Sequence, residues 1–68
     1  MDNLKLLAKN LRKIRKENNI TIKEMSEIAK IPHSFLKNVD KLNTKRVKLI
    51  YLDKLCSIFN KNINYLFG

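Results

Sequence analysis

Apolar residues recur at intervals of three and four along nearly the whole chain, and this spacing restricts the chain to helices. The clearest stripe consists of Leu4, Leu7, Leu11 and Ile14. Alternation with a period of two, which indicates a half-buried strand, is weak throughout. With one Gly and one Pro among 68 residues, few positions interrupt a helix. The pattern predicts an all-α fold, and the length predicts a single domain over residues 1–68.

The first two helices have recognisable beginnings. The first helix is expected from about Asp2 to Asn18, with Asp2 or Asn3 as its N-cap. Thr21 and Glu24 match the capping box, in which the side chain of each residue accepts a hydrogen bond from the backbone N–H of the other. A second helix is therefore expected to begin directly after Thr21. Its apolar positions are Met25, Ile28 and Ala29.

Three further helices are expected at helical spacing. The second helix ends near Lys30, and Pro32 fits the first turn of a third helix that ends at Asp40, because a missing N–H is tolerated there. A polar, basic loop is expected over residues 41–46. A fourth helix ends near residue 60, and Asn62 caps a short fifth helix. The apolar positions of the fourth helix are Leu49, Leu52, Leu55, Cys56 and Phe59.

The charge is strongly positive and unevenly distributed. Fifteen Lys and Arg residues oppose six Asp and Glu residues, for a net charge of +9. Residues 32–48 hold five basic residues and one acidic residue. Such an excess is typical of a protein with a polyanionic partner such as a nucleic acid. A lysine-rich, soluble surface encoded by an A/T-rich genome is the alternative that charge alone leaves open.

Membrane and secreted proteins are disfavoured by the same sequence. No run of apolar residues approaches the ~20 needed to cross a bilayer, so no membrane partner is expected. The first residues lack the basic-then-apolar order of a secretory signal. Cys56 is the only cysteine, which excludes an internal disulfide. These features predict a cytoplasmic protein.

Catalytic and metal-binding residues are not apparent in the sequence. His33 has no Cys or His partner at ligand spacing, and Ser34 has no accompanying base and acid. Cys56 lies on an apolar helical face, which is typical of a core residue. We therefore expect no enzymatic activity, no metal and no cofactor.

The second and third helices form a pair suited to reading DNA. Only residues 30–32 separate them, a tight turn of the kind that joins DNA-reading helices. In such pairs the second helix enters the major groove. Leu36 and Val39 are expected to point into the core, and the opposite face is then free to contact base edges. This base-reading face consists of His33, Ser34, Lys37 and Asn38.

Three segments resemble the phage-repressor/Cro-type (XRE-like) helix-turn-helix family. Residues 25–40 (MSEIAKIPHSFLKNVD) resemble the motif itself, and residues 11–21 (LRKIRKENNIT) resemble the first helix and the entry to the second. Residues 52–67 (LDKLCSIFNKNINYLF) resemble the closing element, so the resemblance covers essentially the whole chain. It implies a compact five-helix bundle of the lambda-repressor-like kind, with the helix-turn-helix motif at about residues 21–40, in a bacterial or phage transcriptional regulator.

The sequence departs from the family pattern at four positions. The usual Ala of the second helix is Ser26, which is still small, and the usual Gln that opens this helix is Ile22. The Gly of the turn is Lys30, and the Gly that follows the third helix is Leu42. Lysine can adopt the left-handed conformation of a turn glycine at a cost of roughly 1 kcal/mol.

The resemblance also implies roles for individual residues. In the family an Arg late in the first helix pairs with an acid that ends the third helix, and the matching residues are Arg15 and Asp40. The positions expected to contact the DNA backbone are Thr21, Lys23, Phe35, Lys41, Asn43, Thr44, Lys45 and Arg46. The basic loop that contains Lys45, Arg46 and Lys48 is expected to clamp phosphates, with a merely solvated loop as the alternative.

The carboxyl end is expected to support dimerisation. A short fifth helix cannot turn all of its apolar residues toward one small core, so an apolar patch is left at the surface. The residues expected at this interface are Ile63, Tyr65 and Phe67.

We therefore expect double-stranded DNA as the partner of a sequence-specific regulator, a repressor that binds a palindromic operator as a homodimer, at least on DNA. Phosphate contacts would supply much of the affinity, and base contacts of the third helix would supply the discrimination. Two alternatives are open: an antitoxin that represses its own promoter, and a protein-interaction module built on the same fold. A complete small regulator and the amino-terminal domain of a longer repressor both agree with this sequence.

Overall fold

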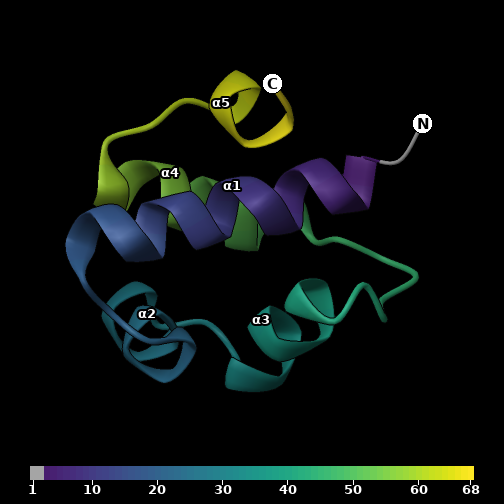
Figure 1. Cartoon of the computed structure of the whole chain (residues 1–68), viewed down its shortest axis with the longest axis horizontal. Helices are drawn as coiled ribbons and strands as arrows, with labels where there is room; N and C mark the ends of the chain where they lie inside the picture. Colours follow the sequence, from purple (N-terminus) through teal and green to yellow (C-terminus); the bar gives the residue numbers. More distant parts are fainter. Residues whose placement is uncertain (1–2) are drawn as a thin grey trace.

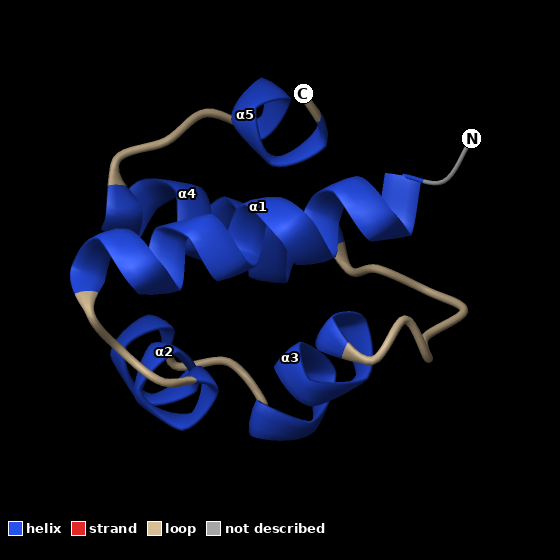
Figure 2. Ribbon diagram, viewed as in Figure 1, coloured by secondary structure: helices blue, strands red, loops and turns tan. Residues whose placement is uncertain are grey.

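The computed structural model describes residues 3–68, and all regular structure in that part of the chain is helical. The described residues form five helices, and Figure 2 shows them with the loops that connect them. Their bounds are α1 (Asn3–Asn18), α2 (Ile22–Ala29), α3 (His33–Asp40), α4 (Leu49–Phe59) and α5 (Ile63–Phe67). The expected all-α, five-helix architecture is confirmed. Asp2, one of the two expected caps of the first helix, lies outside the described residues.

The long helix α1 forms the centre of the molecule. Figure 1 shows α5 on one side of α1 and the pair α2–α3 on the other, and α1 packs directly against both α5 and α3. The α2 helix packs in turn against α3 and α4. Seven side chains are fully buried where these helices meet: Leu7, Ile14, Met25, Val39, Leu52, Leu55 and Leu66. The α2–α3 pair therefore rests on a single core that all five helices share.

The beginning and end of α2 follow from its sequence. The hydroxyl of Thr21 accepts a hydrogen bond from the backbone N–H of Glu24 at 3.1 Å, and the Glu24 carboxylate accepts one from the N–H of Thr21 at 2.9 Å. This confirms the capping box. Lys30 ends the helix in the left-handed conformation, with φ 56°, so lysine takes the backbone geometry of the turn glycine that it replaces.

Left-handed residues end other helices as well. Asn19 and Asn60, with φ of 56° and 58°, follow α1 and α4, and asparagine tolerates this conformation better than most residues. Leu42, with φ 59°, adopts it in the loop after α3, at the second position where the family has glycine. The α3 helix begins at His33, and Pro32 is its N-cap instead of a residue of its first turn, because Pro32 keeps an extended ψ of 132°.

Polar contacts fix α5 to α1. The buried side-chain amide of Asn10 donates a hydrogen bond to the carbonyl of Leu66 at 2.9 Å. The Nζ atom of Lys61 lies 4.5 Å from the ring centroid of Tyr65 and 3.4 Å from the carboxylate of Glu17. A short helix that would be marginal in isolation is thus held against the central helix.

Two apolar positions expected from helical spacing are exposed in the structure. Leu49 keeps 68% of its surface exposed and Ile28 keeps 46%, whereas Leu52 and Ala29 are buried. The spacing identified the correct faces, but in the described part of the chain no other helix covers the first turn of α4 or that edge of α2. Within residues 3–68, no helix is both long enough and apolar enough to cross a bilayer.

Candidate nucleic-acid interface

The outer face of α3 presents the four expected base-reading residues to solvent. Leu36 and Val39 are buried because they lie three residues apart and face the core. The opposite face is then exposed along both turns of the helix. Its residues are His33, Ser34, Lys37 and Asn38, all of them exposed. Between them they offer an amide, a hydroxyl, an imidazole and an ammonium group, which are the donors and acceptors that base edges can pair with.

An aromatic contact fixes the inner side of α3. The rings of Phe35 and Tyr51 lie 4.9 Å apart between centroids and are tilted by 56°. The Nζ atom of Lys48 lies 5.5 Å from the centroid of the Tyr51 ring. Phe35, which we expected at the DNA backbone, is half-buried, so its ring joins α3 to α4. This contact links the base-reading helix to the basic loop.

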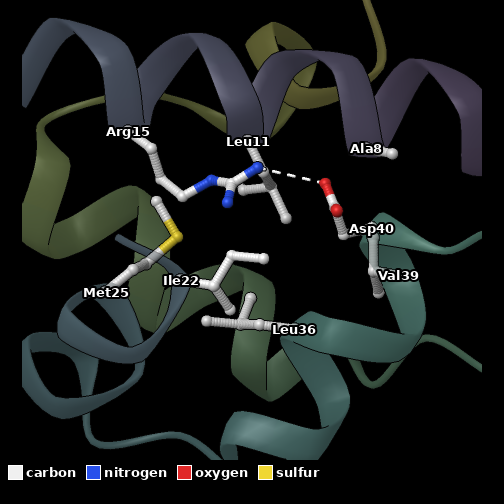
Figure 3. Close-up of a pocket in the computed structure, with 8 residues that line it drawn as sticks. All are labelled: Ala8, Leu11, Arg15, Ile22, Met25, Leu36, Val39 and Asp40. Carbon is white, nitrogen blue, oxygen red and sulfur yellow. Dashed lines mark hydrogen bonds and ion pairs between the residues drawn. The ribbon is translucent and has the colours of Figure 1, made fainter. Parts of the chain in front are cut away.

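The carboxylate of Asp40 joins the end of α3 to α1. The Nη2 atom of Arg15 donates a hydrogen bond to Oδ1 of Asp40 at 3.0 Å, and Figure 3 shows the two side chains reaching toward each other above the core. The pair inferred from the family resemblance therefore forms. Arg12 donates to the same oxygen, also at 3.0 Å. We did not identify Arg12 from the sequence, although it lies three residues before Arg15 and hence on the same face of α1.

The space below this ion pair is filled almost completely. Apolar side chains that include Leu11, Met25 and Leu36 surround a void of about 10 Å³ (Figure 3). A void of this size holds at most one water molecule. The pair consequently covers a packed core at the place where α3 meets α1.

The beginning of α2 places two expected backbone-contacting residues at the surface. Thr21 and Lys23 are both exposed. The capping box uses the N–H of Thr21 and one acceptor site of its hydroxyl, so the hydroxyl hydrogen is left to donate to a ligand. The positive end of the helix dipole lies at the same place, which favours an anion.

The loop after α3 presents the other expected phosphate contacts. Lys41, Asn43, Lys45 and Arg46 are exposed, and Thr44 is half-buried. The hydroxyl of Thr44 donates to the carbonyl of Arg46 at 2.8 Å, so this side chain shapes the loop. Four basic residues, Lys41, Lys45, Arg46 and Lys48, follow the last turn of the base-reading helix.

The carboxyl-terminal residues expected at a dimer interface differ in exposure. Ile63 is exposed, whereas Tyr65 and Phe67 are half-buried and pack against the core. Ile58 is also exposed, close to the end of α4. The apolar surface at this end of the molecule therefore flanks the connection between α4 and α5.

Comparison with known proteins identifies the family. The family of Cro/C1-type helix-turn-helix DNA-binding domains matches residues 10–67 of the chain. Comparisons with curated proteins and with solved structures find no match. The matched region contains α2, the tight turn and α3, together with all of the exposed residues described above. The chain thus belongs to the Cro/C1-type helix-turn-helix DNA-binding domain family, and it is a DNA-binding transcriptional regulator.

Proposed function

We propose that this protein is a repressor that binds a palindromic operator as a two-fold dimer, with α3 in the major groove. The main support is the exposed face of α3, where four hydrogen-bonding side chains project from a helix that the core and Asp40 hold in place. A helix held in one position favours sequence discrimination, because its hydrogen-bond donors and acceptors keep one register against the base edges. Asn38 is the residue that we propose to pair with adenine.

The phosphate contacts are proposed to lie on both sides of α3. The loop residues Lys45 and Arg46 would contact one stretch of backbone, and Thr21 and Lys23 at the start of α2 would contact another. Such contacts position a protein on the duplex without reading sequence. About six phosphate contacts would give a log–log slope of affinity against salt near ~−5.

The proposed dimer contact is the apolar surface that flanks the connection between α4 and α5. Ile58 and Ile63 are exposed there, 45% and 37% respectively, and no residue among 3–68 covers them further. A two-fold contact between copies would remove both side chains from water. It would also set the two base-reading helices about one DNA turn, roughly 34 Å, apart.

Selection of bound duplexes from a random DNA pool tests this function. An enriched palindrome with half-sites one turn apart is expected. On the selected duplex, Asn38→Ala should cost ~1–3 kcal/mol and relax preference at one base pair. The matched variant Lys45→Ala should weaken selected and scrambled duplexes alike and make the salt slope shallower by about one.

Two results would contradict the proposal. A salt slope flatter than about −2 would mean that the basic residues serve mainly as a solvated surface. An unchanged ratio of selected to scrambled affinity in Asn38→Ala would mean that α3 does not read the bases. If Lys45→Ala changed this ratio instead, the loop would be the reading element.

A further inference from the structure

A row of lysines runs along the outer side of α1. The core side of this helix holds Leu7, Leu11 and Ile14, which are buried. Positions on the opposite side of a helix are then turned to solvent. They are occupied by Lys5, Lys9, Lys13 and Lys16, all of them exposed. We call these four residues the α1 lysine face, and none of them has been assigned above to base reading or to phosphate contact.

The lysines repeat about once per helical turn. Lys5, Lys9 and Lys13 are four residues apart, and a rise of about 1.5 Å per residue separates them by roughly 6 Å along the helix axis. Lys16 lengthens the row to about 16 Å. A DNA duplex carries one negative charge per ~1.7 Å of its axis, so a stretch of this length offers a phosphate to each lysine. The spacing therefore suits a polyanion better than a single small anion.

The charge of the α1 lysine face is not neutralised within residues 3–68. The ion pairs found there involve Arg12, Arg15 and Lys61, and none of the four lysines. Glu17, the only acidic residue of α1, is itself paired with Lys61 at 3.4 Å. Like charges four residues apart destabilise a helix by repulsion. A bound polyanion would remove this repulsion, and no internal ion pair would have to break.

The composition of α1 favours a nucleic acid over a protein or a membrane. Every exposed residue of α1 is polar or charged. A stable protein interface has a desolvated centre from which charged residues are depleted, and a helix that lies on a membrane needs apolar side chains beside its basic ones. Non-specific binding to a DNA backbone, by contrast, derives its free energy from charge neutralisation and counterion release. The α1 lysine face therefore fits a DNA backbone.

The α1 lysine face lies apart from the base-reading face of α3. Leu36 and Val39 line the same core space as Ala8 of α1, so α3 turns its buried side toward α1 and its base-reading face away from it (Figure 3). On the other side of α1, toward α5, the Nζ atom of Lys13 lies 5.8 Å from the ring centroid of Tyr65 (Figure 1). A duplex bound by α3 thus lies beyond α3 as seen from α1, and the lysines are left free for a different stretch of DNA.

We propose that the α1 lysine face binds the backbone of a second DNA segment, so that one protein molecule joins two segments. The ligand is a row of phosphates, and such contacts carry no sequence information. The segment belongs either to another duplex or to a distant part of the same duplex, which present the same chemistry. The inference rests on the proposed function only in that α3 holds the first segment, and it requires neither a palindrome nor a dimer.

Capture of a second duplex tests the site with a charge-matched pair of variants. Operator duplex is fixed to a surface, saturated with protein and washed, and a labelled duplex without the operator is then added. Lys5→Gln/Lys9→Gln removes two charges from the face, and the control Lys30→Gln/Lys54→Gln removes two from exposed positions elsewhere. The native protein and the control are expected to capture the labelled duplex, and the face variant is expected to capture it at least about fivefold more weakly.

Salt dependence shows whether the four lysines act together. Four phosphate contacts predict a log–log slope near ~−3.6 for capture of the second duplex, and two contacts predict ~−1.8 for the face variant. Affinity for the operator alone is expected to change by less than about twofold in either variant, because distant charges are screened by salt. A loss of operator affinity equal to the loss of capture would place the lysines on the first duplex and overturn the proposal. Capture that the face variant leaves unchanged would come from α3 of another copy and would also overturn it.

A second assay distinguishes the two sources of the DNA segment. A duplex of about 1,000 bp, several persistence lengths long, carries one operator at its end, and its ring closure by ligase is followed at low DNA concentration. Faster ring closure with the native protein than with the face variant assigns the segment to the same DNA. Capture of the labelled duplex without faster ring closure assigns it to a separate duplex. The absence of both effects overturns the proposal.

Two further outcomes separate this site from an acidic protein partner and from the proposed function. Binding of poly-glutamate that requires Lys5 and Lys9, without capture of any duplex, would assign the face to an acidic protein and overturn the DNA assignment. If operator selection fails, an anchored duplex of random sequence replaces the operator, and loss of capture in the face variant then supports the second site although the proposed function has failed. Circular dichroism checks that both variants are folded.

Discussion

The two ion pairs of Asp40 should contribute unequally to stability, although their geometry is the same. Both arginines lie 3.0 Å from the same carboxylate oxygen, so distance does not distinguish them. Burial distinguishes the two arginines, because the side chain of Arg15 is 15% exposed and that of Arg12 is 54% exposed, beside 29% for Asp40. The perturbations are the single changes Arg12→Gln, Arg15→Gln and Asp40→Asn, and the two double variants that combine Asp40→Asn with one of the arginine changes.

The expected magnitudes follow from screening. Unit charges about 4 Å apart attract by ~4 kcal/mol at an effective dielectric of about 20 and by ~1 kcal/mol in water. Part of this attraction is offset by desolvation and by fixing the side chains. We expect a coupling free energy of about 1–2 kcal/mol between Arg15 and Asp40. The exposed Arg12 should couple by at most about 0.5 kcal/mol.

Urea unfolding followed by far-ultraviolet circular dichroism measures both couplings, and thermal unfolding followed in the same way measures Tm. Asp40→Asn should be the most damaging single change because it leaves two guanidinium groups without their acceptor, and Tm should fall by roughly 10 °C. The double variant Arg15→Gln/Asp40→Asn should lose less stability than Asp40→Asn alone. Equal couplings for the two arginines, or a coupling of zero for Arg15, would refute the dependence on burial.

Three further changes probe other parts of the molecule. Lys30→Gly removes a left-handed lysine and should stabilise the fold by about 1 kcal/mol in the same unfolding assay, whereas no gain would mean that φ 56° is unstrained here. Burial raises the pKa of the Cys56 thiol, and the nearby Asp53 carboxylate raises it further. Alkylation of Cys56 by iodoacetamide at pH 8 should therefore be slower in the native protein than in urea, and it should accelerate as the pH rises. Equal alkylation rates in the native protein and in urea would contradict this. In sedimentation, Ile63→Glu should change the complex from two protein copies per operator duplex to one. The control Ile28→Glu, at an exposed isoleucine on α2, should leave two copies bound. Two copies still bound with Ile63→Glu would place the interface elsewhere.

Features that depend on neighbouring residues were predictable from the sequence. The capping box needs only Thr21 and Glu24, three residues apart, and both of its hydrogen bonds form. Asn62 caps α5 in the same local way, with its side chain accepting from the N–H of Tyr65. The exposed face of α3 followed from the burial of Leu36 and Val39, since helical geometry sets the opposite face once one face is buried.

Features that depend on distant partners were not predictable in this way. Asn10 donates to a carbonyl 56 residues away, and nothing in its local sequence marks it as buried. Leu49 was counted among the apolar positions of the fourth helix, yet it is exposed, because spacing defines a face and not how far neighbouring helices cover it. Arg12 had a local signal, its position one turn before Arg15, but the shared acceptor became evident only when α1 and α3 were packed together.

The two turns that lack their usual glycine have a consequence for how operator preference can change. Lys30 and Leu42 hold left-handed backbones at a cost in free energy, and neither side chain lies on the base-reading face of α3. Glycine at either position would raise the stability of the domain without altering a residue that reads bases. New side chains on α3 commonly destabilise a small domain, and a more stable domain tolerates more of them. These turns are therefore positions where a lineage, or a directed-evolution experiment, can gain tolerance before it acquires a new operator.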